Sequence, residues 1–424
     1  MTQPSAPSIA IACGGTGGHL FPGLAVAEQL IKRGCAVTLL VSPKEVDQQA
    51  VKMARDVQIV TLPAVGLQNR NYFSFGGSFL KSWLAARKCF QQFKPSAALA
   101  MGGFTSAPPI LAARQFGAKT FLHESNTIPG KANRWLSRFV NQCFVGFPQA
   151  AARLHHRQVV VTGTPVRPQF QPRDPASCRT ALGLDPQLPT ILVMGGSQGA
   201  SGINDLIIHS LETLQNPGRA RHSVRAAAPQ TAPANDPTPG AIHPLSPFQF
   251  FHLAGPSDVE KVRQAYAQKN LRAIVHPFFA EMDLALGAAT VAVSRSGASS
   301  LAELAAVRVP SLLVPFPAAT DNHQFFNAKA LEETGAARLL EQKTATPEAV
   351  AQLILELAGN TAAREPMQTA LAQWHAPHAA EEIAETMLRM IAQETQSAAA
   401  HSHGAKKSCG CGENRAELRA KTAA

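Results

Sequence analysis

Two glycine-rich turns of this 424-residue chain have the composition of phosphate-binding loops. The first, Gly14–His19 (GGTGGH), follows the apolar run Ile9–Ala12 and precedes a helical pattern that starts at Phe21. The second, Gly195–Ala200 (GGSQGA), follows the apolar run Leu188–Val193 and also precedes a helical pattern. Glycines let the backbone approach a cluster of oxygens, and unpaired N–H groups at a helix N-terminus attract negative charge. One such loop also occurs where no ligand binds, but a second copy favours two nucleotide-binding halves.

Polar residues follow other predicted strands, at the edge where an open α/β sheet binds its ligands. Arg167 ends a proline-containing turn and can pair with a phosphate through two hydrogen bonds. Ser294–Glu303 (SRSGASSLAE) is a small-residue turn that opens a helix. Its Glu303 is placed to accept hydrogen bonds from a pair of sugar hydroxyls. The alternative is that Glu303 is an ordinary surface residue. The strand Lys119–Leu122 delivers four residues that we expect to line the cleft, unless they make local turns: His123, Glu124, Ser125 and Asn126.

Between these segments, short apolar runs alternate with helical stretches, which is typical of a parallel sheet covered on both faces. We therefore predict an α/β fold of two Rossmann-like, doubly wound parallel-sheet domains that face a cleft. The length fits two domains. We place them at residues 1–167 and 168–364, with a Pro-, Ala- and Arg-rich insertion at 216–247 and a disordered tail at 396–424.

The composition, with 45% hydrophobic and 16% charged residues, is that of a globular protein. No apolar run approaches the roughly 18–20 residues that cross a bilayer. The polar start lacks a basic region before Ile9, so we do not expect a secretory signal. Seven widely spaced cysteines do not indicate a disulfide framework, and we expect a reduced cytoplasm.

The positive charge is concentrated in the first domain. Residues 1–167 hold 18 Lys and Arg against 5 Asp and Glu, a net charge of +13, whereas the rest of the chain sums to −2. Such a field attracts the phosphates of nucleic acid or of an anionic membrane. Asn71–Lys94 places aromatic residues among lysines and arginines, which suits a helix in the headgroup plane; an amphipathic core helix is the alternative. Nucleic acid is not expected, because no recognised nucleic-acid signature is present.

Seven segments, in this order, together resemble the MurG family of bacterial N-acetylglucosaminyltransferases, in glycosyltransferase family 28: GGTGGH, MGGF, HESN, GTPVR, GGSQGA, RSGASSLAE and DNHQFFNA. The resemblance covers about residues 8–395, and the combination is specific to the family. It implies a GT-B fold and inverting transfer of GlcNAc from UDP-GlcNAc to the C4 hydroxyl of lipid I (undecaprenyl-pyrophosphoryl-MurNAc-pentapeptide), giving lipid II and UDP for peptidoglycan synthesis. It also implies that the donor binds in the second domain and the acceptor in the first. A final helix, at about 365–395, is expected to pack back on the first domain.

The same resemblance implies roles for individual residues. Asn126 and Gln324 match contacts to the GlcNAc, and Phe279 matches the position that packs on uracil. Arg167 and Ser197 match phosphate contacts, and Glu303 matches the ribose contact. The full substrate-binding set implied is Thr16, Gly17, Gly18, Asn126, Arg167, Ser197, Phe279, Ala298, Ser299, Ser300, Leu301, Ala302, Glu303 and Gln324. One departure is HESN in place of the familiar HEQN, so that Ser125 cannot reach as far as a glutamine.

The mechanism expected from these residues is direct displacement at the anomeric carbon. His19 is the candidate general base, because histidine titrates in a range suited to that role. Glu124 is the alternative base, and His19 as a structural holder of its loop is the alternative role. The second-half loops and Arg167 can stabilise the leaving UDP. No Asp-x-Asp motif is present, so we expect neither a metal nor another cofactor.

The resemblance makes an anionic membrane surface the expected partner of Asn71–Lys94. It places the protein peripherally on the cytoplasmic face of the inner membrane. A UDP-GlcNAc 2-epimerase shares the fold, but GGTGGH and the membrane segment argue against it. A dinucleotide-dependent oxidoreductase needs an acid after the second strand, and Leu39–Ser42 supplies none. A non-catalytic membrane adaptor would tolerate loss of His19, Glu303 and Gln324. The tail segment His401–Cys411 could hold a soft metal, with a disordered terminus as the alternative.

Overall fold

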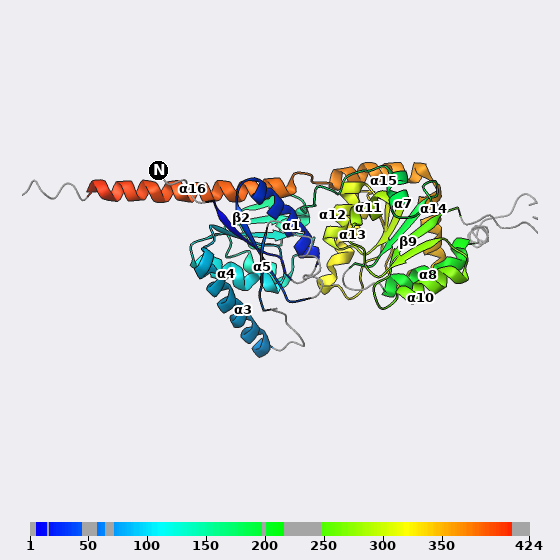
Figure 1. Ribbon diagram of the computed structural model, residues 1–424, viewed down its shortest axis with the longest axis horizontal. Helices are drawn as coiled ribbons and strands as arrows, with labels where there is room; N and C mark the ends of the chain where they lie inside the picture. The colour runs from blue at the N-terminus through cyan, green and yellow to red at the C-terminus, as the bar shows by residue number, and fades with distance from the viewer. Residues whose placement is uncertain are drawn as a thin grey trace, which may run out of the picture.

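The computed structural model describes residues 6–14, 17–44, 57–63, 72–196, 201–215 and 247–408. They form two lobes, each built on a parallel β-sheet with helices packed against it (Figure 1). This confirms the predicted fold class. The predicted insertion at 216–247 falls outside the described residues except for its last position, and so does the tail beyond residue 408.

The sheet of the first lobe has seven parallel strands in the order β3-β2-β1-β4-β5-β6-β7. They are β1 (Ser8–Ala12), β2 (Ala36–Val41), β3 (Gln58–Thr61), β4 (Ala97–Ala100), β5 (Lys119–Glu124), β6 (Gln142–Val145) and β7 (Val159–Val161). The strand order reverses between the neighbours β1 and β4, and ligands of open α/β sheets bind beyond the carboxyl ends of strands at such a point. The GGTGGH turn follows β1 and Gly102-Gly103 follow β4, so both motifs belong to this edge.

Helices cover both faces of this sheet because successive side chains of a strand point to opposite faces. On one face, Ile9 and Ile11 of β1 share a core with α1 and α16. On the other face, Ala10 and Ala12 share a core with α3 and α4, and such small side chains let helices approach closely. The helices wholly within this lobe are α1 (Gly17–Lys32), α3 (Tyr72–Phe93), α4 (Ala107–Gln115), α5 (Lys131–Leu136) and α6 (Pro148–Ala151).

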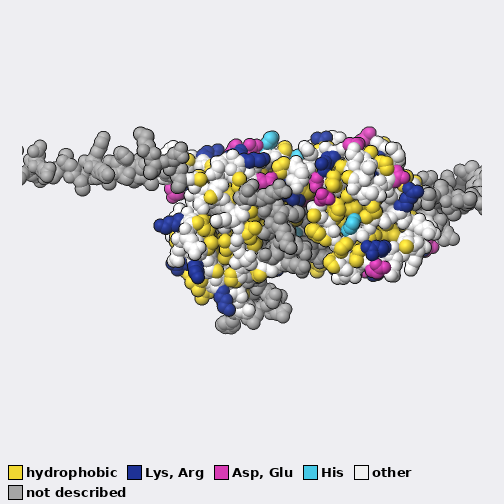
Figure 2. Space-filling model, viewed as in Figure 1, with side chains coloured by type: hydrophobic (Ala, Val, Ile, Leu, Met, Phe, Trp, Pro, Cys, Tyr) yellow, Lys and Arg dark blue, Asp and Glu magenta, His cyan; other side chains and the backbone are white. Residues whose placement is uncertain are grey.

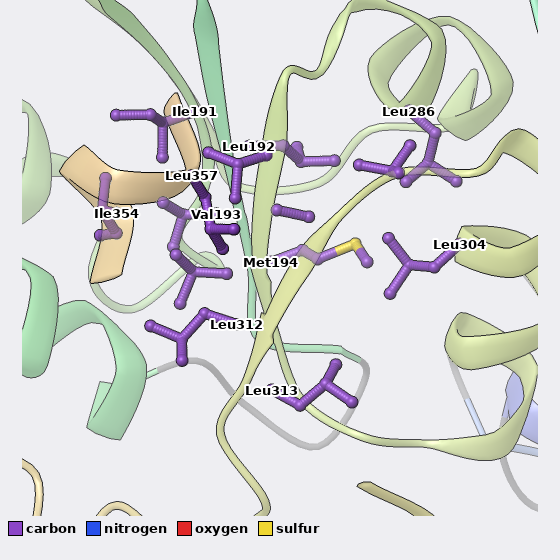
Figure 3. Close-up of a cluster of buried hydrophobic side chains, with 14 of the residues drawn as sticks. Ile191, Leu192, Val193, Met194, Leu286, Leu304, Leu312, Leu313, Ile354 and Leu357 are labelled. Carbon is purple, nitrogen blue, oxygen red and sulfur yellow. The ribbon is translucent and has the colours of Figure 1, made fainter. Parts of the chain in front are cut away.

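The sheet of the second lobe has six parallel strands in the order β10-β9-β8-β11-β12-β13, and here the order reverses between β8 and β11. The strands are β8 (Thr190–Met194), β9 (Gln249–Leu253), β10 (Ala273–His276), β11 (Val291–Ser294), β12 (Ser311–Leu313) and β13 (Arg338–Leu339). The buried strand residues pack against helices on both faces, and Figure 3 shows Ile191 and Leu312 beside Ile354 and Leu357 of α14. The helices are α7 (Pro175–Ala181), α8 (Ser201–Gln215), α10 (Val259–Gln268), α11 (Met282–Ala288), α12 (Ala298–Val307), α13 (His323–Glu332) and α14 (Pro347–Gly359).

Within the described residues, two chain connections join the lobes. The first follows β7, and the second lies between α15 (Thr361–Trp374) and α16 (Ala379–Ser408). They touch at Gly163, which has a φ of +80° and no room for a Cβ, because that atom would collide with the side chain of Ala376. A glycine is therefore required at this crossing both for its backbone angle and for its size.

The C-terminal helix expected at about 365–395 is in fact two helices. α15 packs on the second lobe through Met367 and Leu371, and only α16 returns to the first lobe, where Ile383 and Met387 are buried. Pro377 lies in the break, and a proline disfavours helix at the residue before it. α16 lies along the first lobe and extends beyond it (Figure 1).

The tail and two strands also differ from what the sequence predicts. The tail predicted to be disordered from residue 396 is helical to Ser408. The strand β6 and the two-residue strand β13 were not expected from the sequence. Among the described residues, no helix combines the length and hydrophobicity needed to cross a bilayer.

Candidate active site where the two lobes meet

The N-termini of two helices from different lobes meet at the carboxyl ends of the sheets. α1 begins at Gly17 and α12 begins at Ala298. The hydroxyl of Ser299 donates to the backbone carbonyl of Gly18 over 2.8 Å, which fixes the two helix starts beside each other. Each helix start carries unpaired backbone N–H groups and the positive end of a helix dipole. The arrangement can therefore hold a group with several negative charges, such as a diphosphate.

The structure brings together most of the predicted donor-binding residues around this point. Gly17, Ala298 and Leu301 are buried, and Gly18, Ser299, Ser300, Ala302 and Glu303 are partly exposed. Two predicted residues, Thr16 and Ser197, lie outside the described residues.

His19 lies over the Gly102-Gly103 turn that follows β4. A Cβ on Gly102 would be only 2.7 Å from Cε1 and 2.9 Å from Nδ1 of the imidazole, and Gly102 has a φ of +120°. The turn is held to the first glycine loop by Thr105, whose hydroxyl donates to the carbonyl of Gly14 over 2.6 Å. His19 as a whole residue is partly exposed although its Nδ1 atom is buried, so solvent or a ligand can reach the residue at the edge of the sheet.

Gly102→Ala should therefore disturb the position of His19. We expect about 1–3 kcal/mol of lost stability from the unfavourable φ together with the contact, and at least a tenfold loss of activity. Gly117→Ala is the matched control, because Gly117 has a φ of +80° but a Cβ added there would meet nothing within 4 Å. Thermal unfolding and turnover of both variants check this prediction; equal activity in the two would contradict it.

The HESN segment splits into three buried residues and one that reaches the site. His123 is fully buried between the carbonyl of Gly163, 3.0 Å from Nε2, and the hydroxyl of Ser125, 3.2 Å from Nδ1. Its burial lowers its pKa, which keeps the imidazole neutral. Only Asn126 is partly exposed. The expectation that all four residues line the cleft is therefore wrong for the buried ones, because His123 and Glu124 belong to the buried strand β5 and Ser125 directly follows them.

Glu124, the alternative base, is 2% exposed and accepts four hydrogen bonds. One oxygen accepts from the backbone N–H and the side-chain amide of Asn126, at 2.9 and 3.0 Å. The other accepts from the backbone of Gly130 at 3.0 Å and the amide of Asn133 at 2.7 Å. A carboxylate offers about four lone-pair sites, so these bonds occupy them. This arrangement favours a role in shaping the loop over one in proton transfer.

Gln324 and its neighbours belong to a network at the start of α13. Its side-chain oxygen accepts from the backbone N–H of Phe316 over 2.9 Å, which leaves the amide nitrogen as the end available to a ligand. Its backbone carbonyl accepts from the hydroxyl of Ser296 over 2.7 Å. The next residue toward β11, Arg295, is 5% exposed and donates to the carbonyls of Val314 and Pro315. Sequence reasoning did not single out this arginine, although an arginine directly after a buried strand was a readable signal.

Arg295 is a buried cation whose described hydrogen bonds go to backbone carbonyls. Desolvation lowers its pKa to about 10, and its guanidinium lies 5.4 Å from the ring centre of Phe316. These contacts fix residues 314–316, and the backbone N–H of Phe316 in turn binds the side chain of Gln324. Arg295 therefore helps to hold Gln324 in place.

Glu303 and Arg167 approach the site from the two lobes. Glu303 is partly exposed, yet loss of hydration around its carboxyl raises its pKa to about 7, an effect that the charge of Arg167 partly opposes. The guanidinium of Arg167 lies between two rings, 4.7 Å from the centre of Phe21 and 5.2 Å from that of Phe170. Its Nε is buried and has no hydrogen-bond partner among the described residues. A positive group with unused donors suits an anionic ligand.

Phe279 follows β10 at the same edge of the second sheet. It is partly buried and packs edge-on against Phe251, with ring centres 5.1 Å apart. His276 lies on another side at 5.5 Å. The ring is thus held in place and can offer apolar surface to a planar base.

Within the described residues, no group of three or more His, Cys, Asp or Glu side chains is placed to hold a metal ion. The side chains of the tail segment His401–Cys411 lie outside the described part.

Comparison with known proteins identifies the family. The glycosyltransferase family 28 N-terminal domain matches residues 9–145, and the family 28 C-terminal domain matches residues 190–386. A relative from Xanthomonas axonopodis pv. citri (strain 306) is named UDP-N-acetylglucosamine--N-acetylmuramyl-(pentapeptide) pyrophosphoryl-undecaprenol N-acetylglucosamine transferase. It is 35% identical over 392 residues, which cover 91% of this chain and 83% of the relative. A relative of the same name from Myxococcus xanthus (strain DK1622) is 31% identical over 391 residues, which cover 91% of this chain and 93% of the relative.

Solved structures agree with this assignment. The crystal structure of Acinetobacter baumannii MurG matches with a TM-score of 0.67 and 28% identity, covering 91% of this chain and 99% of that one. A UDP-GlcNAc 2-epimerase from Neisseria meningitidis matches with a TM-score of 0.59 at 13% identity, covering 90% of this chain and 100% of that one, which shows a shared fold alone. Because relatives above 30% identity cover nine-tenths of the chain and both domains match, this chain belongs to glycosyltransferase family 28.

Proposed function

We propose that this chain transfers GlcNAc from UDP-GlcNAc to the C4 hydroxyl of lipid I, releasing UDP and forming lipid II for peptidoglycan synthesis. The names of the relatives support this reaction. The structural observation that carries the proposal is the contact between Ser299 and Gly18, because it joins the N-termini of α1 and α12 into one anion site.

The donor is expected to bind mainly to the second lobe. Its diphosphate lies at the paired helix starts, with Arg167 adding a positive charge. Glu303 accepts bonds from the ribose hydroxyls, and Phe279 packs on the uracil. The GlcNAc reaches across to the first lobe, where Asn126 and the amide nitrogen of Gln324 contact it. Thr16, Gly17, Gly18, Ser197 and residues 298–302 complete the proposed donor site.

The transfer step is a displacement with inversion. The C4 oxygen of the muramoyl unit attacks the anomeric carbon, and the bond from that carbon to the diphosphate oxygen breaks. The C4 hydroxyl gives its proton to a ring nitrogen of His19, and UDP leaves with the bonding electron pair. Helix starts that are already in place stabilise the charge on UDP without reorganising, and such preorganisation is often the largest catalytic contribution.

Acceptor-dependent release of UDP tests this proposal. Purified protein should release UDP from UDP-GlcNAc when a lipid I analogue is present, and should continue to do so in EDTA. Release that is equally fast without the acceptor would indicate hydrolysis or another reaction of the nucleotide sugar, and would count against the proposal.

A second part of the proposal is that the protein binds an anionic membrane surface through α3 and α4, on the cytoplasmic face of the inner membrane. A groove of about 570 Å³ lies between these helices and is lined by Phe79, Leu80, Trp83, Leu111, Arg114 and Gln115. Leu80 is 53% and Leu84 is 50% exposed, and the guanidinium of Arg87 lies 4.8 Å from the ring centre of Trp83. Figure 2 shows hydrophobic side chains beside Lys and Arg on this part of the first lobe. Exposed apolar residues beside cations such as Arg87 and Arg114 suit a layer of anionic headgroups above acyl chains.

Replacing Leu80 and Leu84 together by glutamate should weaken binding to vesicles of phosphatidylglycerol and phosphatidylethanolamine by at least about tenfold, since burying each leucine contributes about 1.5–3 kcal/mol. Ile59→Glu is the control, because Ile59 is 40% exposed on the same lobe but lies on β3. Vesicle sedimentation measures both variants. If the Ile59 variant weakens binding as much as the double variant, net charge rather than the α3 surface explains the effect.

A further inference from the structure

Asn327 forms the centre of a polar network that joins the two lobes. It is fully buried on α13 of the second lobe. Its side-chain oxygen accepts from the backbone N–H and from the hydroxyl of Thr127 in the first lobe, both at 2.9 Å. Its amide nitrogen donates to the side-chain oxygen of Asn126 at 3.0 Å and to the carbonyl of Ser296 at 3.2 Å. A side-chain amide has two donor hydrogens and two acceptor sites, so this one is fully used.

These bonds fix which end of each amide is oxygen. A backbone N–H such as that of Thr127 can only donate and a carbonyl such as that of Ser296 can only accept, so Asn327 has one possible orientation. Asn126 is oriented in the same way from two sides, because its nitrogen donates to Glu124 while its oxygen accepts from Asn327. Neither asparagine can flip without placing two donors or two acceptors against each other.

The side-chain amide of Asn126 is therefore held in a single orientation toward a ligand. Its two side-chain bonds use one hydrogen and one oxygen lone pair, and within the described structure the partly exposed side chain keeps one of each for a ligand. An N-acetyl group also has one N–H and one carbonyl, so an amide in this orientation can pair with it.

From this geometry we propose that Asn327 is a positioning residue for recognition of the donor sugar, acting through Asn126 and not by touching the donor. The inference rests on the proposed function, in which Asn126 contacts the GlcNAc. Because the partners of Asn327 belong to both lobes, the same side chain makes recognition of the sugar depend on contact between the lobes.

Asn327→Asp is the sharpest variant, since it keeps the shape and the acceptor for Thr127 but replaces the donor nitrogen by an oxygen that repels Asn126 and Ser296. Calorimetric affinities for UDP-GlcNAc and for UDP, which lacks the sugar, separate the proposed role from general damage. We expect UDP-GlcNAc to bind at least tenfold more weakly and UDP to change by less than about threefold. An equal loss for both ligands would overturn the inference.

A double-mutant cycle with Asn126→Ala tests whether the effect passes through Asn126. In the absence of the Asn126 amide, Asn327→Asp should have little further effect on UDP-GlcNAc binding. Fully additive effects would overturn the inference. If Asn327→Asp does not fold, Thr127→Val tests the inference instead, because this variant removes one hydrogen bond to Asn327. It should weaken UDP-GlcNAc binding a few-fold and leave UDP binding unchanged. An equal loss for both ligands, or no loss, would then overturn the inference.

Asp321→Asn is the matched control. Asp321 pairs with Arg134 of the first lobe at 2.9 Å, so this variant removes the negative charge, and thereby weakens another contact between the lobes, without touching Asn126. Both affinities should stay within about twofold of the wild type; a sugar-selective loss here would assign the effect to lobe contact in general and overturn the specific role of Asn327. Absence of transfer by the wild-type protein would instead refute the proposed function, so the two failures are distinguishable.

Discussion

His19→Ala should reduce the turnover number by roughly 10²–10⁴-fold, the usual contribution of a general base, with donor affinity nearly unchanged. The side chain lies over Gly102 at the edge of the first sheet, across from the helix start that carries Ser299. From there it can accept the proton of an acceptor hydroxyl but has no proposed contact with the nucleotide. Steady-state kinetics with a lipid I analogue, together with UDP-GlcNAc binding, measures the two effects separately.

A second variant separates the base from a structural holder of the loop. His19→Gln fills a similar space over the Gly102-Gly103 turn and can still form hydrogen bonds, but it cannot take up a proton at neutral pH. If His19 is the base, the glutamine variant should be as inactive as the alanine variant. Recovery of most activity with glutamine would show that the residue only holds the loop.

Glu303→Gln should impair donor use and at the same time stabilise the free protein at high pH. A carboxylate that accepts two ribose hydroxyls makes charge-assisted bonds of about 1.5–3 kcal/mol each, so kcat/KM for UDP-GlcNAc should fall by about 10²-fold. Desolvation raises the pKa of this carboxyl to about 7 in the folded protein, from an ordinary value near 4.5.

The sign of the stability effect follows from proton uptake. Between pH 4.5 and 7 the folded protein holds a proton on Glu303 that the unfolded chain has lost, so this group lowers the stability as the pH rises through that window. Above pH 7 the carboxylate is charged and poorly hydrated when no donor is bound, at a cost on the order of 2 kcal/mol. Replacing Glu303 by glutamine removes this charge and therefore its cost in stability.

Thermal unfolding near pH 5 and near pH 8 checks this second prediction. The glutamine variant should melt at a higher temperature than the wild type near pH 8 and at a similar temperature near pH 5. A gain of the same size at both pH values would mean that packing, not ionisation, is responsible. Glu348→Gln, on α14, is the control for loss of one surface carboxylate and should show neither effect.

The fold could be predicted from the sequence because its strands are short apolar runs separated by helical stretches. The candidate site could be proposed from the sequence because its motifs follow those strands, and the carboxyl ends of parallel strands lie at one edge. The resemblance to a family then gave roles to residues such as Glu303 and Gln324. A helix after Pro377 could also be predicted, because a proline disfavours helix at the residue before it, whereas the single helix expected at about 365–395 came from the resemblance alone.

The orientation of side chains at the site could not be predicted in the same way. His123 and Asn126 are three residues apart in one polar segment, yet one is buried and the other reaches the site, which depends on how the chain turns after β5. The bond between Asn126 and Asn327 joins residues 201 positions apart and arises only when the lobes meet. The raised pKa of Glu303 likewise depends on burial of its carboxyl, which arises only in the folded chain.

The fate of labelled sugar is the most direct test of the central claim. UDP-GlcNAc labelled in the sugar is incubated with the protein and a lipid I analogue in EDTA, and the lipid and nucleotide fractions are separated. The account predicts that the label enters the acceptor in a β-linkage, in amounts equal to the UDP released. Label that remains in the aqueous fraction as an epimerised or free sugar would contradict it.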